Sequence, residues 1–286
     1  MDVRHAFRTK MVRPAPELVV APLALDPLSA ALARSVGFSA IYLGGGGMGY
    51  ARGTTEALLT ASELAEACRA ITERVEIAVV VDGGVGFGDA VHMYRSVRML
   101  EQAGAAAVEI EDQVSPKRAH HHKGVEHLVP ADEMAGRIEA ARLGRHGDYP
   151  VVIARCNAFS HEEIEATLER ARRYEAAGAE LLMLLPRTPE QFEAATKGTS
   201  APLAAMTTGP GRLPSEMTAA GYALSVDAMS ATVLGFRALK SGYEGIRDRQ
   251  DYGLSREEVA ATIHEVGATI GIEQFYEIEE RTTERG

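Results

Sequence analysis

The chain of 286 residues is long enough for one large α/β domain or two small ones. Its content of 46% hydrophobic and 24% charged residues is typical of a globular protein. A formal net charge of −10 without a long basic run argues against nucleic acid or an anionic membrane as partner. The chain has no apolar stretch long enough to span a bilayer and no signal-peptide core, and Cys68 and Cys156 lack metal-type spacing. We therefore expect a cytoplasmic protein with reduced thiols.

Short apolar segments alternate with amphipathic ones along the chain. The predicted strands are residues 18–22, 38–43, 77–81, 106–110, 151–155, 181–185, 203–206 and 223–226. The predicted helices are residues 26–34, 60–71, 89–103, 130–143, 162–177, 189–195 and 228–241, and the tail from Ser255 to Arg285 is predicted to form two more, split near Gly271. Strands and helices in this alternation predict an α/β protein with a (β/α)8 TIM barrel. We expect residues 1–286 to form a single domain in which 242–286 is a C-terminal helical extension for oligomer contacts.

The fourth predicted strand leads into the most informative stretch, AAVEIEDQVSPKRAHHHKGVEHLVP, at residues 106–130. Side chains alternate along a strand, so Glu109 and Glu111 point to one side and Ile110 to the other. Two inward carboxylates so close together repel one another, and they need a cation, a proton or a basic neighbour. The polar, histidine-rich run that follows the strand is typical of an active-site loop.

Polar or glycine residues follow four successive predicted strands: Gly44–Gly49, Asp82, Glu111 and Arg155. In a (β/α)8 barrel the ligand lies at the carboxyl ends of the strands. These features, which are distant along the chain, are therefore expected to converge at one mouth.

The glycine run offers backbone N–H groups that are suited to a carboxylate or a phosphate. Gly44, Gly46 and Gly49 also match the pattern G-x-G-x-x-G. We discount a dinucleotide site, because that motif must open directly into a helix with an acid on the next strand. The alternative interpretation is a flexible turn of the barrel.

Asp82 is placed to bind a divalent cation with Glu111 as its partner, and the alternative is a capping or turn aspartate. Arg155 ends an apolar strand and can hold a substrate carboxylate bidentately, or it can form an ion pair with Glu109 or Glu111. Both interpretations of Arg155 are compatible.

Three consecutive histidines, His120 to His122, lie in the predicted loop. Their spacing and the lack of cysteine or HExxH context argue against a zinc site. A mobile lid that carries one acid/base histidine is the functional interpretation, and a solvated loop is the alternative.

With these residues in place the chain resembles the isocitrate lyase/phosphoenolpyruvate mutase superfamily, and most closely its methylisocitrate-lyase and carboxyphosphonoenolpyruvate-mutase branch. The resemblance covers roughly residues 5–245. It rests on the segments DPLSA at 26–30, VD at 81–82 with GFG at 86–88, GAA at 104–106, EDQ at 111–113 with PKR at 116–118, VP at 129–130 and IAR at 153–155. It implies a (β/α)8 barrel whose last helix is exchanged with a neighbour in a dimer, within a tetramer. It also implies Mg²⁺, with Mn²⁺ as the alternative, and cleavage or formation of C–C or P–C bonds through an enolate-like intermediate.

The resemblance assigns roles residue by residue. The metal residues are Asp82, Glu111 and Glu56. The substrate-binding residues are Tyr42, Gly44, Gly45, Gly46, Arg155 and Asn157. The residues it assigns to catalysis are Lys117 and His121 on the lid and Arg155 at a strand end, and our own inference from the sequence adds Glu109.

Several positions depart from the pattern of the superfamily. The second metal aspartate becomes Gly84, the lid cysteine becomes Ala119, and the serine before the oxyanion glycines becomes Gly44. Acids and polar residues of strands six to eight are replaced at Leu185, at 205–208 and at 227–228. We expect Glu109 to replace the carboxylate lost at Gly84, and we expect His121 to take the acid/base role of the missing cysteine.

The sequence thus predicts a Mg²⁺-dependent lyase or decarboxylase that acts on a small 2-oxo or 2-hydroxy polycarboxylate, but not by ordinary isocitrate or methylisocitrate cleavage. One alternative is a P–C bond mutase or hydrolase acting on a phosphonate. Another is a non-catalytic barrel that binds a metabolite. The expected partners are the carboxylate substrate and further copies of the chain, as a homotetramer or a homodimer.

Overall fold

The computed structural model describes residues 2–12, 17–209 and 211–284. Eight parallel strands follow one another in the order β1-β8-β7-β6-β5-β4-β3-β2. They are β1 Val19–Ala21, β2 Ala40–Leu43, β3 Ala78–Asp82, β4 Ala107–Glu111, β5 Val151–Arg155, β6 Leu181–Met183, β7 Leu203–Thr207 and β8 Tyr222–Asp227. Beyond β1 the chain pairs with β2, since Tyr42 N donates to Pro22 O at 2.9 Å and Ala24 N to Tyr42 O at 3.0 Å. These bonds close the ring, and the predicted (β/α)8 barrel is confirmed.

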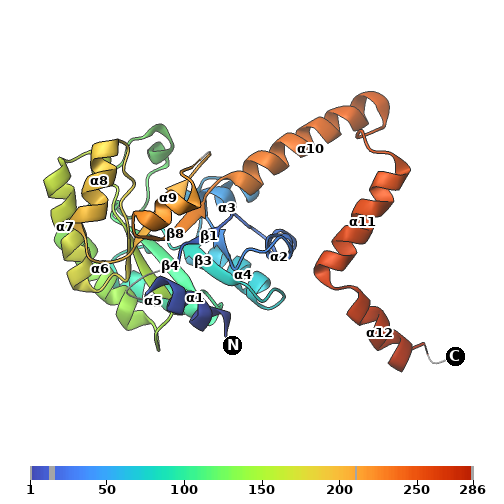
Figure 1. Ribbon diagram of the computed structural model, residues 1–286, viewed down its shortest axis with the longest axis horizontal. Helices are drawn as coiled ribbons and strands as arrows, with labels where there is room; N and C mark the ends of the chain where they lie inside the picture. Colours follow the sequence, from blue (N-terminus) through green and yellow to red (C-terminus); the bar gives the residue numbers. More distant parts are fainter. Residues whose placement is uncertain (1, 13–16, 210, 285–286) are drawn as a thin grey trace.

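Helices surround the barrel, as Figure 1 shows. They are α1 Val3–Met11, α2 Pro27–Ser35, α3 Gly45–Ala51, α4 Ala61–Thr72, α5 Ala90–Gln102, α6 Ala131–Gly144, α7 Ile164–Ala177, α8 Pro189–Gly198, α9 Pro214–Ala219, α10 Ser230–Arg249, α11 Arg256–Ile270 and α12 Glu273–Thr282. Short 3-10 helices occur at η1 Glu56–Leu58, η2 Ala119–Lys123 and η3 Ala158–Ser160. Asp26 and Thr60 cap α2 and α4 through capping boxes, as their sequence context indicates.

The glycine run is helical, so the interpretation of this run as a flexible turn is wrong. The argument against a dinucleotide site assumed that the glycine run does not open directly into a helix. That assumption is wrong, because the run leads straight into α3. Glycine is a weak helix former, but here close approach of other groups demands it. A Cβ at Gly45 would lie 2.9 Å from Asp82 Oδ2 and 2.9 Å from Glu56 Oε2, and a Cβ at Gly49 would lie 2.4 Å from the Glu56 backbone nitrogen.

Two apolar layers hold the barrel together. Small and branched side chains such as Val80, Ile153 and Leu224 fill its interior, and a larger cluster that includes Ile71, Leu100 and Ile138 packs the helices against the outside of the sheet. Glu109 is fully buried and faces the interior at the carboxyl end of β4, whereas Ile110 joins the outer cluster, which is the alternation expected of a strand.

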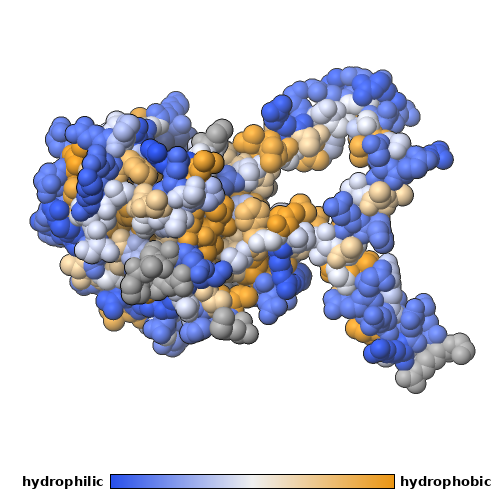
Figure 2. Space-filling model, in the orientation of Figure 1, coloured by the Kyte–Doolittle hydropathy of each residue, from blue (hydrophilic) through white to orange (hydrophobic). Residues whose placement is uncertain are grey.

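The C-terminal helices leave the barrel. The predicted helix over 228–241 is longer than expected: α10 runs to Arg249 across position 242, and Figure 1 shows it pointing away from the barrel, with α11 and α12 forming an arm. Arg285, the last residue of the predicted tail, lies outside the described residues. Exposed apolar residues lie along α10, including Leu234, Phe236 and Leu239, and on α2, including Leu28 and Leu32; Figure 2 shows apolar surface where α10 meets the barrel. No helix in the described residues is long and apolar enough to cross a membrane.

Candidate active site

The carboxyl ends of β3, β4 and β5 bring the predicted polar residues together. Asp82 is the register partner of Glu109, and Glu111 is the register partner of Arg155. Because neighbouring parallel strands end at the same edge, acids two residues apart on β4 each face a different functional side chain. Asp82, Glu111 and Arg155 therefore lie together at one rim of the barrel, as expected.

Asp82 is held by backbone amides from both sides. Its Oδ2 accepts from Gly45 N at 3.0 Å, and its Oδ1 accepts from Gly84 N at 2.9 Å. The side chain is 5% exposed. Burial raises the pKa of Asp82, and the neighbouring Glu56 and Glu111 add to this rise. The Gly45 amide, which was expected to hold a substrate carboxylate, is thus used here by a carboxylate of the protein itself.

Glu109 lies on the floor of the mouth between Tyr42 and Arg155. The Tyr42 hydroxyl donates to Glu109 Oε2 at 2.9 Å, and Arg155 NH1 donates to Oε1 at 3.2 Å. Burial raises the pKa of Glu109 to about 7, with Asp82 contributing, although Arg155 and the Tyr42 hydroxyl oppose the rise. A carboxyl group with this pKa can exchange a proton near neutral pH.

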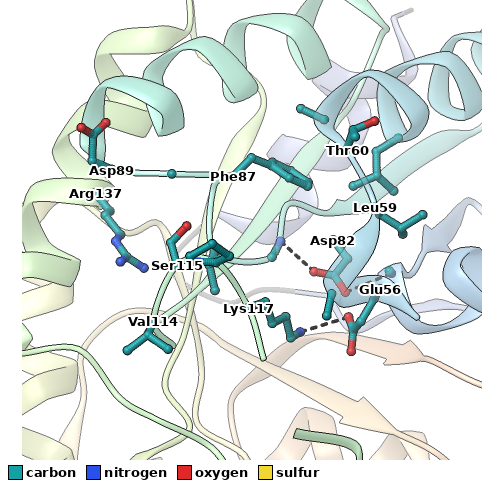
Figure 3. A pocket seen from close by; sticks show the side chains of 18 of the residues that line it. Glu56, Leu59, Thr60, Asp82, Phe87, Asp89, Val114, Ser115, Lys117 and Arg137 are labelled. Carbon is teal, nitrogen blue, oxygen red and sulfur yellow. Dashed lines mark hydrogen bonds and ion pairs between the residues drawn. The ribbon is translucent and has the colours of Figure 1, made fainter. Parts of the chain in front are cut away.

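Lys117 joins the lid loop to the strand ends. Its Nζ lies 2.6 Å from Glu111 Oε1 and 3.0 Å from Glu56 Oε2. Figure 3 shows the contact with Glu56. Burial opposes ionisation of Glu111, but Lys117 and Arg155 outweigh it and lower the pKa of this carboxyl. Glu56 and Asp82 flank Gly45, so the ammonium lies within a group of acids that come from η1, β3 and β4.

The lid histidines differ in their surroundings. His121 Nε2 contacts Glu56 Oε1, while its Nδ1 lies 2.6 Å from the Arg118 carbonyl oxygen. Burial works against the charged ring, but the bonds to Glu56 and Arg118 prevail and raise the pKa of His121. His122 lies 2.6 Å from Thr55 Oγ1, and burial lowers its pKa, whereas His120 is exposed. Of the three, His121 has the surroundings that an acid/base residue needs.

Arg155 makes the ion pairs that were one of its two interpretations. Besides Glu109, its Nε lies 3.6 Å from Glu111 Oε2 and donates to Asn157 Oδ1 at 3.0 Å. The Arg155 side chain is 13% exposed, so it is not fully closed off from solvent. The structure therefore keeps a role in substrate binding open to Arg155, with its orientation fixed by its acidic neighbours.

Sequence reasoning missed the residues that brace this site. Asp112 is buried behind β4 and accepts from Asn157 N at 3.0 Å and from the Tyr174 hydroxyl at 2.9 Å. Gln113 Nε2 and Asn157 Nδ2 donate to Glu111 Oε2 at 2.9 and 3.1 Å. The segment EDQ was noted as a motif, but nothing in its spacing reveals that its second acid faces outward and ties β4 to β5.

The charges of the site fit a divalent cation. Glu56, Asp82, Glu109 and Glu111 converge on two permanent cations, Lys117 and Arg155. Such an excess of buried acid is unfavourable without further positive charge. Carboxylate oxygens are the ligands that Mg²⁺ prefers, and Asp82, Glu111 and Glu56 supply them, directly or through water.

A cavity of about 700 Å³ opens beside Asp82. Figure 3 shows Asp82, Glu56 and Lys117 at one end of it and Arg137 with Asp89 at the other. Its lining comes from α3, η1 and α4, the loop after β3, and the loop that leads from β4 to the lid. Asp82 and Glu56 therefore border a space large enough for a small-molecule ligand.

Comparison with known proteins defines the class. A model of the family described as phosphoenolpyruvate phosphomutase matches residues 9–239. The chain belongs to this family, and its predicted membership of the isocitrate lyase/phosphoenolpyruvate mutase superfamily, as an enzyme, is confirmed.

Individual relatives narrow the comparison. A 2-methylisocitrate lyase of Aeropyrum pernix is 36% identical over 84% of this chain and 78% of its own length. A 2,3-dimethylmalate lyase of Eubacterium barkeri is 31% identical over 92% of this chain and 93% of its own length. The crystal structure of a phosphonopyruvate hydrolase in complex with oxalate and Mg²⁺ superimposes with a TM-score of 0.87 at 28% identity, covering 99% of both chains.

Proposed function

We propose that the protein is a Mg²⁺-dependent lyase or decarboxylase that acts on a small 2-oxo or 2-hydroxy polycarboxylate through an enolate-like intermediate. The observation that carries this proposal is the convergence of Glu56, Asp82 and Glu111 with Lys117 and Arg155 at the end of three adjacent strands. The names of the two lyase relatives, both of which describe cleavage of carboxylates, support it.

The metal would be held by Asp82, Glu111 and Glu56, and it would supply electrophilic stabilisation of the developing enolate. Arg155 provides the fixed cation for a substrate carboxylate, with Tyr42 and Asn157 setting the position of its surroundings. The amide of Gly46 and the N-cap residue Gly44 form the wall that would face the carboxylate, since the Gly45 amide already donates to Asp82. Gly44 and Gly46 have no side chain between backbone and substrate, and this suits close approach.

Proton transfer falls to the lid. His121 is held between Glu56 and the Arg118 carbonyl, and we assign it the acid/base role that Ala119 cannot fill. Lys117 keeps the lid loop against the acids until substrate binds, because its ammonium contacts both Glu56 and Glu111. Closure of this loop excludes water from the reactive enolate.

Hydrolysis of a phosphonate is the second candidate. The crystal structure of a phosphonopyruvate hydrolase with oxalate and Mg²⁺, which superimposes on 99% of this chain at 28% identity, supports it. Ala119 in place of a lid cysteine also removes the group expected of a C–C lyase.

Two measurements test these proposals. Calorimetry should show oxalate binding only when Mg²⁺ or Mn²⁺ is present, because oxalate mimics the enolate of pyruvate. Oxaloacetate, substituted malates and phosphonopyruvate should then be screened for pyruvate release. Lack of metal-dependent oxalate binding would contradict an enzyme of this type. Release of pyruvate from phosphonopyruvate alone would select the second candidate.

The arm formed by α10 to α12 is proposed to dock on another copy, giving a homodimer or a homotetramer with exchanged helices. Exposed Leu234, Phe236 and Leu239 on α10 support this, because such apolar residues are normally covered. Light scattering should give a dimer or tetramer mass, and Phe236→Glu should shift it toward the monomer. A monomeric wild type would contradict the proposal.

A further inference from the structure

The cavity beside Asp82 is larger than a small acid requires. Its volume of about 700 Å³ lies in the range that accommodates drug-sized ligands. We propose that it is a specificity pocket for a neutral apolar substituent of the substrate. The substrate class is then a 2-oxo or 2-hydroxy acid that carries an aliphatic or aryl group beside the reacting carbons. This inference rests on the proposed function, because it places the reacting end of the molecule at Asp82.

The cavity is continuous with the proposed metal site at one end only. Gly45, Asp82 and Lys117 border that end, and Figure 3 shows Lys117 and Glu56 beneath the opening. From that end the space extends along the loop after β3, the start of α4 and the segment after β4, so a substituent of a substrate held there would lie between these elements. The polar and reactive groups stay at the metal end.

The walls are apolar over most of their length. The apolar side chains that line the space are Leu59, Leu64, Val85, Phe87, Val114 and Val129. They come from three separate parts of the chain, η1 with α4, the β3 loop and the segment after β4, so no single amphipathic element accounts for them. Transfer of a hydrocarbon group from water to such a surface is favourable, whereas a charged group would lose its hydration without a partner.

Phe87 supplies a second, independent observation. Its φ of 64° is in the left-handed region, which is uncommon for a bulky residue. Its ring is only partly buried, and in Figure 3 it lies at the cavity between Leu59 and Ser115. A strained backbone that exposes an aromatic ring to a cavity is typical of a ligand contact.

The distal end of the cavity disfavours a second carboxylate. Arg137 is buried there, but its Nη2 donates to Glu133 Oε1 at 2.6 Å and its Nη1 to the Gln113 carbonyl oxygen at 2.8 Å. Asp89, which also lines this end, pairs with His92. Each charge at this end thus already has a partner within the protein. Arg137 Nε has no acceptor in the described part of the chain, so this end can still donate to a neutral oxygen.

A matched pair of ligands tests the inference on the wild-type protein. N-propyl oxamate and N-(2-carboxyethyl)oxamate share the oxalate-like head and differ only in a terminal methyl or carboxylate. With Mg²⁺ present, calorimetry should show the propyl compound binding at least about tenfold more tightly than the carboxyethyl compound. Equal affinity, or a preference for the carboxyethyl compound, overturns the inference even if oxalate binds.

A blocking variant locates the substituent. Ala61, at the start of α4, lines the cavity without touching the proposed metal residues, and Ala61→Phe should fill part of it. We expect this variant to lose about tenfold in affinity for N-propyl oxamate and to bind oxalate within about twofold of wild type. The matched control is Ala166→Phe on the exposed face of α7, which should change neither affinity.

The outcomes separate this inference from the proposed function. Unchanged N-propyl oxamate affinity in a folded Ala61→Phe protein overturns the pocket assignment while the metal site stands. Failure of wild type to bind oxalate with Mg²⁺ overturns the proposed function, and the pocket assignment with it. If Ala61→Phe does not fold, the comparison of the two oxamates on wild type still decides the matter.

Discussion

The two halves of the barrel mouth have opposite character. At the ends of β2 to β5, Glu109 bonds to both Tyr42 and Arg155, and Arg155 also pairs with Glu111. Asp82, the register partner of Glu109, lies beside this group and bonds to backbone amides. In the other half, beyond β6, β7 and β8, the side chains that pack on the barrel interior are Leu185, Met206 and Ala228. Charge in this protein is therefore concentrated on one side. We propose that a cation and the reacting carboxylate bind on this side, while the opposite wall restricts the space without charge.

Asp82 and Asp227 make this contrast specific, because each ends a strand. Asp82 accepts two amide bonds and remains beside Glu56 and Lys117. Asp227 accepts from Met229 N at 3.1 Å and from Ser230 N at 3.2 Å, so its carboxylate caps the start of α10. Asp82, at the end of β3, is thus a proposed metal residue, whereas Asp227, at the end of β8, caps a helix. The two aspartates are distinguished by the charges beside them.

The largest expected effect comes from exchanging these two aspartates for asparagine. Asp82→Asn should lower turnover by on the order of 10⁴-fold, since metal stabilisation is worth several kcal/mol in the transition state. Asp227→Asn should leave turnover within a few-fold and change stability by no more than about 0.5 kcal/mol, because asparagine caps a helix about as well as aspartate. Steady-state kinetics and thermal melts measure both. Equal losses of turnover would remove the distinction between the two halves.

The lid gives the next effect. His121→Gln should lower turnover by roughly 10³-fold, because the ring held by Glu56 and the Arg118 carbonyl is the proposed acid or base. His120→Gln, on the exposed part of the same loop, is the matched control and should remain near wild type. The pH dependence of the rate should lose one limb only in the His121 variant. If neither substitution matters, the lid has no proton-transfer role.

A variant of Glu109 tests whether this side chain replaces the metal-binding carboxylate that is lost at Gly84. Glu109→Gln should weaken Mg²⁺ binding by roughly 10- to 100-fold, the range seen when groups around a metal are changed. The loss should be larger at pH 8 than at pH 6, since the pKa of Glu109 is about 7 and the carboxyl is charged only above it. Calorimetry at both pH values measures it. Unchanged affinity at pH 8 would show that Glu109 does not take this role.

Much of the barrel could be predicted from sequence because its signals are local. Apolar strands such as Val151–Arg155 match their predicted bounds, and caps such as Asp26 and Thr60 begin helices where expected. The helix at Gly45–Ala51 could not be predicted, because its glycines contradict helix propensity. Gly45 is required by the side chains of Asp82 and Glu56, and Gly49 by the backbone at Glu56, and these approaches arise only on folding.

The site was predictable in its members but not in its pairings. Strand ends identified Asp82, Glu111 and Arg155, whereas the contacts of Lys117 with Glu56 and Glu111 depend on how the lid loop folds back. Asp112 was overlooked as a brace because alternation along β4 gives no partner for an outward acid. Pairings across 45 or more residues, such as Asp112 with Asn157, arise from packing and are absent from local pattern.

The smallest expected effect is on stability, and it again singles out the acidic half. The pKa of Glu109 rises from 4.5 to about 7 on folding, so between these pH values the folded protein keeps a proton that the unfolded chain releases. Stability from this group therefore falls as pH rises from 4.5, and the loss is complete above 7, on the order of 3 kcal/mol.

Glu109→Gln removes the titration but keeps the contact of Oε1 with Arg155, and Tyr42 can turn to accept from the new amide. In chelator, melting of wild type relative to this variant should decline by several °C from pH 5 to pH 8. Glu139→Gln, on the exposed face of α6, should follow wild type, and parallel profiles for all three proteins would contradict the raised pKa of Glu109.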